Sequence, residues 1–203
     1  AYAGSTSTLA SLSLHVFPAA SITNGLISYW PLDAVLGTKT ADLVSSYDMS
    51  LVNLSSDDLV DGKYGKAFQF NGTNSLLART HNPGDALPVY QHPEFTISLW
   101  VNGPTPSASI RDRRVFSEGS STNTNPLFNI GTDNRNPPVD GSVDIYIRRD
   151  DGSLDLDHIH STGIAYDWNW HHVVYVQRDI GGGRMKAQLW IDGVLDPLQI
   201  APV

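Results

Sequence analysis

The 203-residue sequence contains no cysteine. This absence excludes thiol catalysis, iron–sulfur clusters and thiolate zinc sites. The sequence also lacks an uninterrupted apolar run of about 18 residues, so we predict no membrane-spanning helix. The first residues lack a basic segment followed by a compact apolar one, so no signal peptide is predicted, and the opening Ala-Tyr-Ala-Gly resembles a mature terminus left after cleavage.

Glutamate and basic residues are scarce. Of the 21 acidic residues only Glu94 and Glu118 are glutamate, and the 13 basic residues leave a formal net charge of −8. We therefore predict no nucleic-acid partner and no attraction to anionic membranes. Glutamate favours helices whereas aspartate favours turns and caps, so this composition predicts a β-protein with many turns.

Charge is absent from the start of the chain, because residues 1–32 contain no Asp, Glu, Lys or Arg. Within this segment apolar and polar residues alternate over residues 12–17, a strand pattern that Pro18 ends. The Ser-, Thr-, Gly- and Ala-rich residues before it are typical of a flexible tail. We therefore divide the chain into an uncharged N-terminal arm, residues 1–24, with a candidate strand at 12–17, and a domain over residues 25–203.

Short strand patterns separated by turn signals fill the domain, and no helical period persists over about three turns. The predicted strands are LISYWPLD, YDMSLVNL, GKAFQFNG, FTISLWVN, VDIYIRR, HHVVYVQR and KAQLWIDG. The glycines at 181–183 are expected to join the last two strands as a hairpin. Strands at this spacing predict a sandwich or barrel. Trp100 and Trp190 each lie mid-strand in an apolar alternation, so we predict that both are core residues.

The histidines do not form a recognisable metal motif. His171 and His172 are neighbours in a predicted strand, so their side chains point to opposite faces of the sheet. His158 and His160 share a face, but two histidines are fewer ligands than a zinc site needs. We expect these side chains to form hydrogen bonds within the sheet or at its edges.

Four blocks, taken in order, resemble the laminin-G-like, concanavalin-A-like jelly-roll family found in extracellular proteins. They are GLISYWPLD, GKYGKAFQFNGTNSLLA, FTISLWVN and the Trp-His-His strand with its hairpin partner ending in Asp192-Gly193. The resemblance covers residues 26–196 and implies an antiparallel two-sheet jelly-roll sandwich. The chain departs from the family in its polar insertions and in ending ten residues after Gly193, where family members usually continue through one or two closing strands.

The resemblance also implies a structural calcium ion near the first family strand. Its candidate ligands here are Asp33 and Asp42, since calcium takes carboxylate and carbonyl oxygens. The alternative is that both are ordinary turn aspartates. Asn53 and Asn71 match the glycosylation pattern, but we expect both to be bare in a bacterial host.

The family fold hosts lectins, adhesion modules, glycosidases and lyases, so the function is left open. Glycosidases need two carboxyl groups about 5–9 Å apart, and Glu94 and Glu118 are distant in sequence, so we predict no enzyme. One reading is a non-catalytic extracellular or cell-surface module of bacterial origin that binds a glycan or a protein surface. Aromatic residues at the sheet rims would stack on sugar rings. The candidates are Trp168, Trp170, Tyr166 and Tyr90, although core and rim packing is the alternative role for the tryptophans.

The sequence leaves two other functions open. The uncharged arm suggests a structural subunit of an extracellular filament, fibre or surface layer, in which residues 12–17 donate a strand to the next subunit. The same arm would otherwise cover its own domain or form a disordered tail. The second further reading is an ancillary domain of a carbohydrate-active enzyme.

Overall fold

The computed structural model of the protein describes residues 24–80, 92–119, 127–138, 140–148 and 154–198. The arm and its candidate strand at 12–17 therefore lie outside the described residues, apart from Asn24. Within the described ranges the chain forms strands and a single 3-10 turn, Ser56–Asp58, but no α-helix. No helix of this part of the chain is long and apolar enough to cross a membrane.

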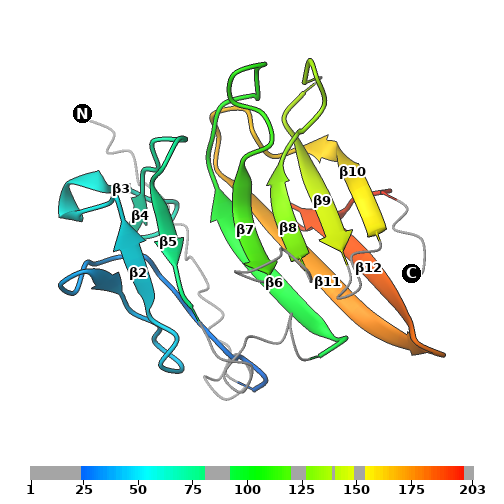
Figure 1. The fold of residues 1–203 in the computed structure, drawn as a ribbon, viewed down its shortest axis with the longest axis horizontal. Helices are drawn as coiled ribbons and strands as arrows, with labels where there is room; N and C mark the ends of the chain where they lie inside the picture. Colours follow the sequence, from blue (N-terminus) through cyan, green and yellow to red (C-terminus); the bar gives the residue numbers. More distant parts are fainter. Residues whose placement is uncertain (1–23, 81–91, 120–126, 139, 149–153, 199–203) are drawn as a thin grey trace, which may run out of the picture.

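Eight strands form two four-stranded antiparallel sheets, which lie one behind the other in Figure 1. Sheet I has the order β10 (Leu154–Ile164), β9 (Ser142–Arg148), β8 (Leu127–Thr132) and β7 (Arg114–Gly119). Sheet II has the order β13 (Val194–Leu195), β12 (Arg184–Ile191), β11 (His171–Gly181) and β6 (Phe95–Val101). The hairpin predicted at 181–183 is confirmed, because β11 and β12 pair from Val173↔Ile191 to Gly181↔Arg184.

The core lies between the two large sheets. Phe128 of sheet I packs its ring 5.6 Å from Phe95 and 4.9 Å from Tyr175 of sheet II, measured between ring centroids. Ile130, Ile145 and other inward residues of sheet I meet the inward face of sheet II, which alternates strictly with its outward face. An antiparallel two-sheet β-sandwich is therefore confirmed, and the jelly-roll connectivity stays a prediction.

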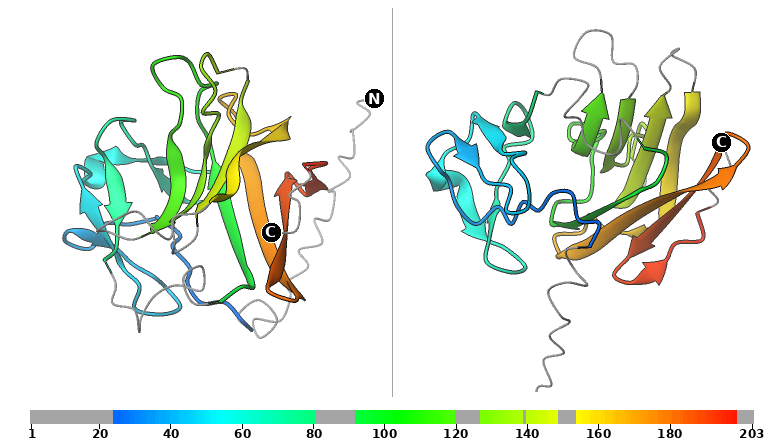
Figure 2. Two further views of the ribbon diagram at one scale, coloured as in Figure 1. Left: turned by 45° about the vertical axis from the view of Figure 1, so that its right-hand side comes forward. Right: turned by 90° about the horizontal axis from the view of Figure 1, so that it is seen from below.

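The N-terminal part of the domain forms smaller sheets beside the sandwich (Figure 2). One sheet has the order β1 (Lys39–Thr40), β2 (Met49–Val52) and β5 (Leu76–Ala78), and the other pairs β3 (Leu59–Asp61) with β4 (Lys66–Phe68). The predicted strand over residues 26–33 is wrong, since no strand forms there. Pro31 has no N–H to donate, Leu32 has a positive φ of 63°, and the Tyr29 N–H donates to the Asp42 side chain rather than to a neighbouring strand.

The prediction that Trp100 and Trp190 are core residues is also wrong. Trp100 is 37% exposed and Trp190 is half-buried, and neither belongs to the core. Side chains alternate along a strand, so the inward direction of Leu99 and Val101 turns Trp100 to the outer face of sheet II. There its indole stacks on His172 at 4.9 Å and meets the ring edge of Tyr64 at 5.6 Å. Trp100 therefore joins the turn between β3 and β4 to sheet II.

Candidate functional site

Four connections between strands gather at one end of the sandwich, which we call the loop end. They follow β6 (102–113), β8 (133–141, of which 139 is not described), β10 (165–170) and β12 (192–193). Successive strands run in opposite directions, so every second connection falls at the same end. The first three lie at the top of Figure 1. Loops held by a rigid scaffold are where binding residues concentrate, so this end is the first place to search for a site.

A partly buried ion pair organises the connection after β8. Asp133 is fully buried, and both of its carboxylate oxygens accept hydrogen bonds of 2.8 Å from the Arg135 guanidinium, one from Nε and one from Nη2. The same Nη2 donates to Asp140 and Ser142 at 3.1 Å each. A bidentate Arg–carboxylate pair fixes orientation as well as charge, so this loop has one preferred geometry.

The connection after β6 is tied to this loop. The Asp112 N–H donates to the Asp133 carbonyl at 3.1 Å, and Arg111 Nη1 donates to the Asn134 carbonyl at 2.6 Å. The Arg113 N–H donates to the Thr132 hydroxyl oxygen at 3.0 Å. A polar cavity, broadly open to solvent, lies beside residues 108–113.

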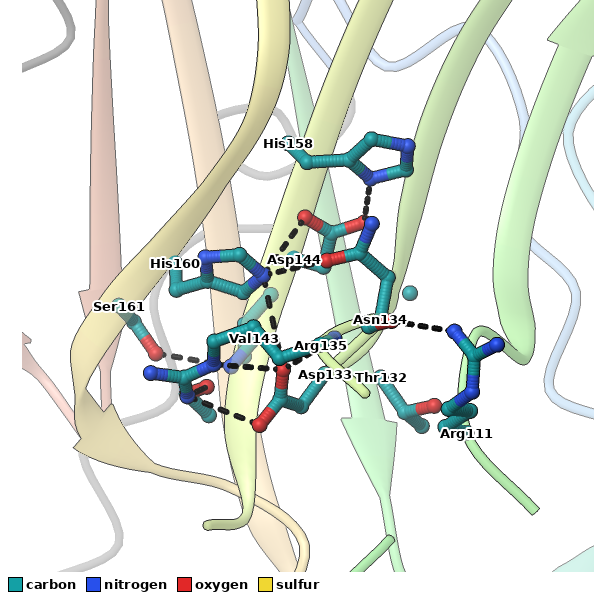
Figure 3. Close-up of polar contacts among 12 residues, drawn as sticks. Arg111, Thr132, Asp133, Asn134, Arg135, Val143, Asp144, His158, His160 and Ser161 are labelled. Atoms are coloured by element: carbon teal, nitrogen blue, oxygen red, sulfur yellow. Dashed lines mark hydrogen bonds and ion pairs between the residues drawn. The ribbon is translucent and has the colours of Figure 1, made fainter. Parts of the chain in front are cut away.

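A strip of histidine and acidic side chains lies on the outer face of sheet I, next to the loop end (Figure 3). Asp144 is 4% exposed and its Oδ2 lies 2.8 Å from His158 Nδ1, while His160 Nε2 lies 2.7 Å from Asn134 Oδ1 and 3.5 Å from Asp144 Oδ1. Burial raises the pKa of Asp144, against the opposing effect of His158. The side chains of this strip mostly contact each other. They cover the outer side of β8 and β9 and hold one another in place.

The predicted calcium ligands have separate hydrogen-bond partners. Asp33 Oδ1 accepts the Lys66 N–H at 2.7 Å, whereas Asp42 accepts from Ser28, Tyr29 and Val44. Burial opposes ionisation of Asp42, but these hydrogen bonds outweigh it and lower the pKa. Among the described residues, no group of three or more histidine, cysteine or acidic side chains is arranged to hold a metal ion. Calcium binding stays a prediction.

Trp168 is the most unusual residue of the loop end. Its side chain is 70% exposed although its backbone adopts a positive φ of 72°. For a bulky residue that conformation is a genuine outlier. Two hydrogen bonds to the neighbouring loop hold it there: the Trp168 N–H donates to the Gly103 carbonyl at 2.8 Å, and its carbonyl accepts from Asn102 Nδ2 at 3.2 Å. The structure thus presents a large apolar ring to solvent on a strained, clamped backbone.

A histidine between two carboxylates fixes the loop that contains Trp168. His171 Nε2 lies 2.9 Å from Asp167 Oδ1, and His171 Nδ1 lies 2.7 Å from Asp192 Oδ2. Two carboxylate acceptors need two N–H donors, which only the imidazolium form supplies. Partial burial works against that charge, but the hydrogen bonds to Asp192 and Asp167 outweigh it and raise the pKa of His171. The hydrogen bonds from Asn169 and His171 lower the pKa of Asp167 to about 2.

The other predicted ligand-binding aromatics have different positions. Tyr166 is only 3% exposed and its hydroxyl donates to the Gly131 carbonyl at 3.3 Å, so the prediction that it stacks on a ligand is wrong. Its apolar ring belongs to the core because β10 ends by turning inward at Ala165 and Tyr166. Trp170 is half-buried, and Tyr90 lies outside the described residues. Of the four, Trp168 is the one that the structure shows to be largely exposed.

The two glutamates lie near different sheets. Glu118 is in β7 of sheet I, where burial raises its pKa to about 7 against the opposing charge of Arg79. Glu94 precedes β6 of sheet II and accepts the Asp179 N–H at 3.2 Å.

Sequence reasoning missed the Asp133–Arg135 pair, the clamp on Trp168 and the bridging role of His171. The signals for the last were present: Asp167 lies four residues before His171, and Asp192-Gly193 ends the strand that pairs with β11. Pairing β11 with β12 places Asp192 beside His172, because the Asp192 N–H donates to the His172 carbonyl at 2.9 Å.

Searches of protein-family models, curated proteins and solved structures find no match to this chain.

Proposed function

We propose that the protein is a non-catalytic extracellular module that binds a glycan at its loop end, with Trp168 as the platform for a sugar ring. The supporting observation is the exposed indole of Trp168 on a clamped backbone with positive φ. Strained conformations persist only where the surroundings impose them, and they cluster at ligand-binding sites. A flat apolar ring in solvent suits the C–H face of a pyranose.

The rigid surroundings of Trp168 favour its role as a platform for a sugar ring. An aromatic ring that is already held in its bound orientation loses little conformational entropy when a ligand binds. The Asn102 bond, the Gly103 bond and the imidazolium of His171 all restrict the loop that contains Trp168. Polar groups for sugar hydroxyls are close in sequence, since Asn169 follows Trp168 and is exposed.

Glycan binding is tested by affinity electrophoresis and tryptophan fluorescence against a panel of soluble polysaccharides. We expect Trp168→Ala to abolish binding and Trp168→Tyr to retain part of it, because tyrosine keeps a stacking face. Tyr64→Ala is the matched control, since Tyr64 is 73% exposed and lies outside the loop end. Retention of full affinity by Trp168→Ala would exclude the loop end as the binding surface.

A second candidate function is a structural subunit of an extracellular assembly. Exposed apolar side chains are concentrated in the N-terminal part of the domain, where Leu36 is 63% and Leu43 is 64% exposed. Such surfaces are typical of protein–protein contacts. Native mass discriminates the two functions: a monomer at micromolar concentration favours the glycan-binding module, and a ladder of higher oligomers favours the assembly subunit.

A further inference from the structure

The loop end contains a cavity of about 320 Å³ that is broadly open to solvent and is lined by Ala108, Ser109, Arg111, Asp112 and Arg113. The cavity and Trp168 share a structural element, because the connection that supplies the cavity residues begins at Asn102 and Gly103, the partners of the Trp168 backbone. The same connection therefore contacts the Trp168 backbone at its start and lines the cavity near its end.

Both arginines of the cavity are held by backbone carbonyls. Arg111 Nη1 donates to the Asn134 carbonyl at 2.6 Å, and Arg113 Nη2 donates to the Ser109 carbonyl at 3.2 Å. Each bond uses one of several N–H donors of a guanidinium, which presents them in a planar fork. The anchored guanidiniums thus keep donors for a planar, bidentate acceptor, and a carboxylate has that geometry.

Acidic residues near the cavity partly offset the charge of its two arginines. Asp112 is the one acidic residue in its lining, and its charge also raises the pKa of Asp144 on sheet I. Arg135 forms ion pairs with both Asp133 and Asp140, which leaves one net negative charge beside the two cavity arginines. The formal net charge of −8 repels anions at long range, so an acidic group is held here only by direct contact.

We propose that the Ser109–Arg113 cavity binds the carboxylate of an acidic sugar, so that the module prefers uronate-containing glycans over neutral ones. This inference rests on the proposed function, in which the sugar ring stacks on Trp168. It adds the ligand class: an acidic polysaccharide whose ring contacts the indole and whose carboxylate contacts Arg113 and Arg111.

The test compares tri-galacturonate with its neutral methyl ester, which has the same rings without the charge. Binding is measured by NMR titration on the intact chain, for the wild type and single variants. We expect Arg113→Gln to weaken binding of the acid by about two- to fivefold, the range for a solvent-exposed ion pair, and to leave the ester unaffected. Asp112→Asn should strengthen binding of the acid, and asparagine tolerates the positive φ of 55° at this position.

Arg178→Gln is the matched control. Arg178 is an exposed arginine on β11. Its backbone lies opposite Lys186 of β12, at the end of β11 away from the loop end. Its loss removes the same charge and should leave the preference for the acid unchanged. An equal loss of affinity in Arg178→Gln and Arg113→Gln would show that net charge alone is responsible, and would overturn the inference.

The remaining outcomes separate this inference from the proposed function. Equal binding of acid and ester, both lost in Trp168→Ala, overturns the carboxylate site and leaves the glycan site intact. A preference for the acid that survives in Trp168→Ala and is lost in Arg113→Gln supports the cavity and contradicts stacking on Trp168. No perturbation of the Arg111–Arg113 resonances by millimolar acid overturns the carboxylate site directly.

Discussion

At position 168 we expect glycine to give a more stable protein than alanine, the reverse of the usual order. Both substitutions remove the same indole, so the packing lost with Trp168 cancels in the comparison. What differs is the backbone: Trp168 has a φ of 72°, which glycine adopts freely and alanine does not. The pair of variants therefore measures the strain in the backbone separately from the contacts of the side chain.

The magnitude follows from two opposing effects. A left-handed conformation costs an L-residue roughly 1–2 kcal/mol. Alanine instead gains about 0.4–1 kcal/mol over glycine, because its unfolded chain has fewer conformations to lose. Taken at mid-range, the difference favours glycine at position 168 by about 0.8 kcal/mol, which corresponds to roughly 2–3 °C in Tm for a domain of this size.

Thermal unfolding followed by circular dichroism, together with urea titration, measures this difference. Trp170 provides the control, since it lies two residues away and is not among the residues with positive φ. There we expect alanine to be the more stable variant. If alanine is as stable as glycine at position 168, the backbone is not held in a strained conformation, and the argument from strain to function fails. Both position-168 variants should lack glycan binding whichever is more stable.

Three other predictions concern stability. His171 has a raised pKa, so its contribution is complete below about pH 6.5 and is lost as pH rises through the raised value; the Tm advantage of wild type over His171→Gln should shrink between pH 6 and pH 9, and a constant advantage would contradict the imidazolium bridge. Leu189→Ala should cost about 2–5 kcal/mol of unfolding free energy because Leu189 is fully buried, whereas Trp100→Ala should cost less, about 1–2 kcal/mol, despite the larger side chain; urea titration would refute this ordering by showing the reverse. If calcium binds near Asp33 and Asp42, added calcium raises Tm and Asp42→Asn abolishes the rise, while an unchanged Tm with calcium and with chelator excludes the site.

Sheet II was largely predictable because its apolar alternation is regular, whereas in sheet I only β9 was predicted and β7, β8 and β10 were missed. Phe95–Val101, Ser142–Arg148 and the hairpin of β11 and β12 all follow a period of two, and glycines with positive φ mark the turn. The same period places Trp100 on the outer face, yet its size and neighbours suggested the core. Alternation gives the direction of a side chain reliably, whereas hydrophobicity alone does not say which face of a sheet is covered.

The site was less predictable because it depends on contacts between loops that are distant in sequence. Asn102 meets Trp168 across 66 residues, and His160 meets Asn134 across 26. Polar residues in turns have no period that would reveal such partners. Trp168 and Tyr166 are two residues apart in one aromatic-rich stretch, but Tyr166 packs in the core, whereas Trp168 has a positive φ and is exposed.

The outer faces of the two sheets are poorer binding surfaces than the loop end for a physical reason. On sheet I, Asp144 Oδ2 and the His160 ring already have partners in His158 and Asn134, so a ligand there must replace good hydrogen bonds before it forms its own. On sheet II, His172 and Tyr64 already contact the indole of Trp100. Trp168 differs because the contacts that fix it are made by its backbone, and its ring remains in solvent. A ligand that stacks on this ring displaces water alone, so its contacts add to those of the folded protein and do not replace them.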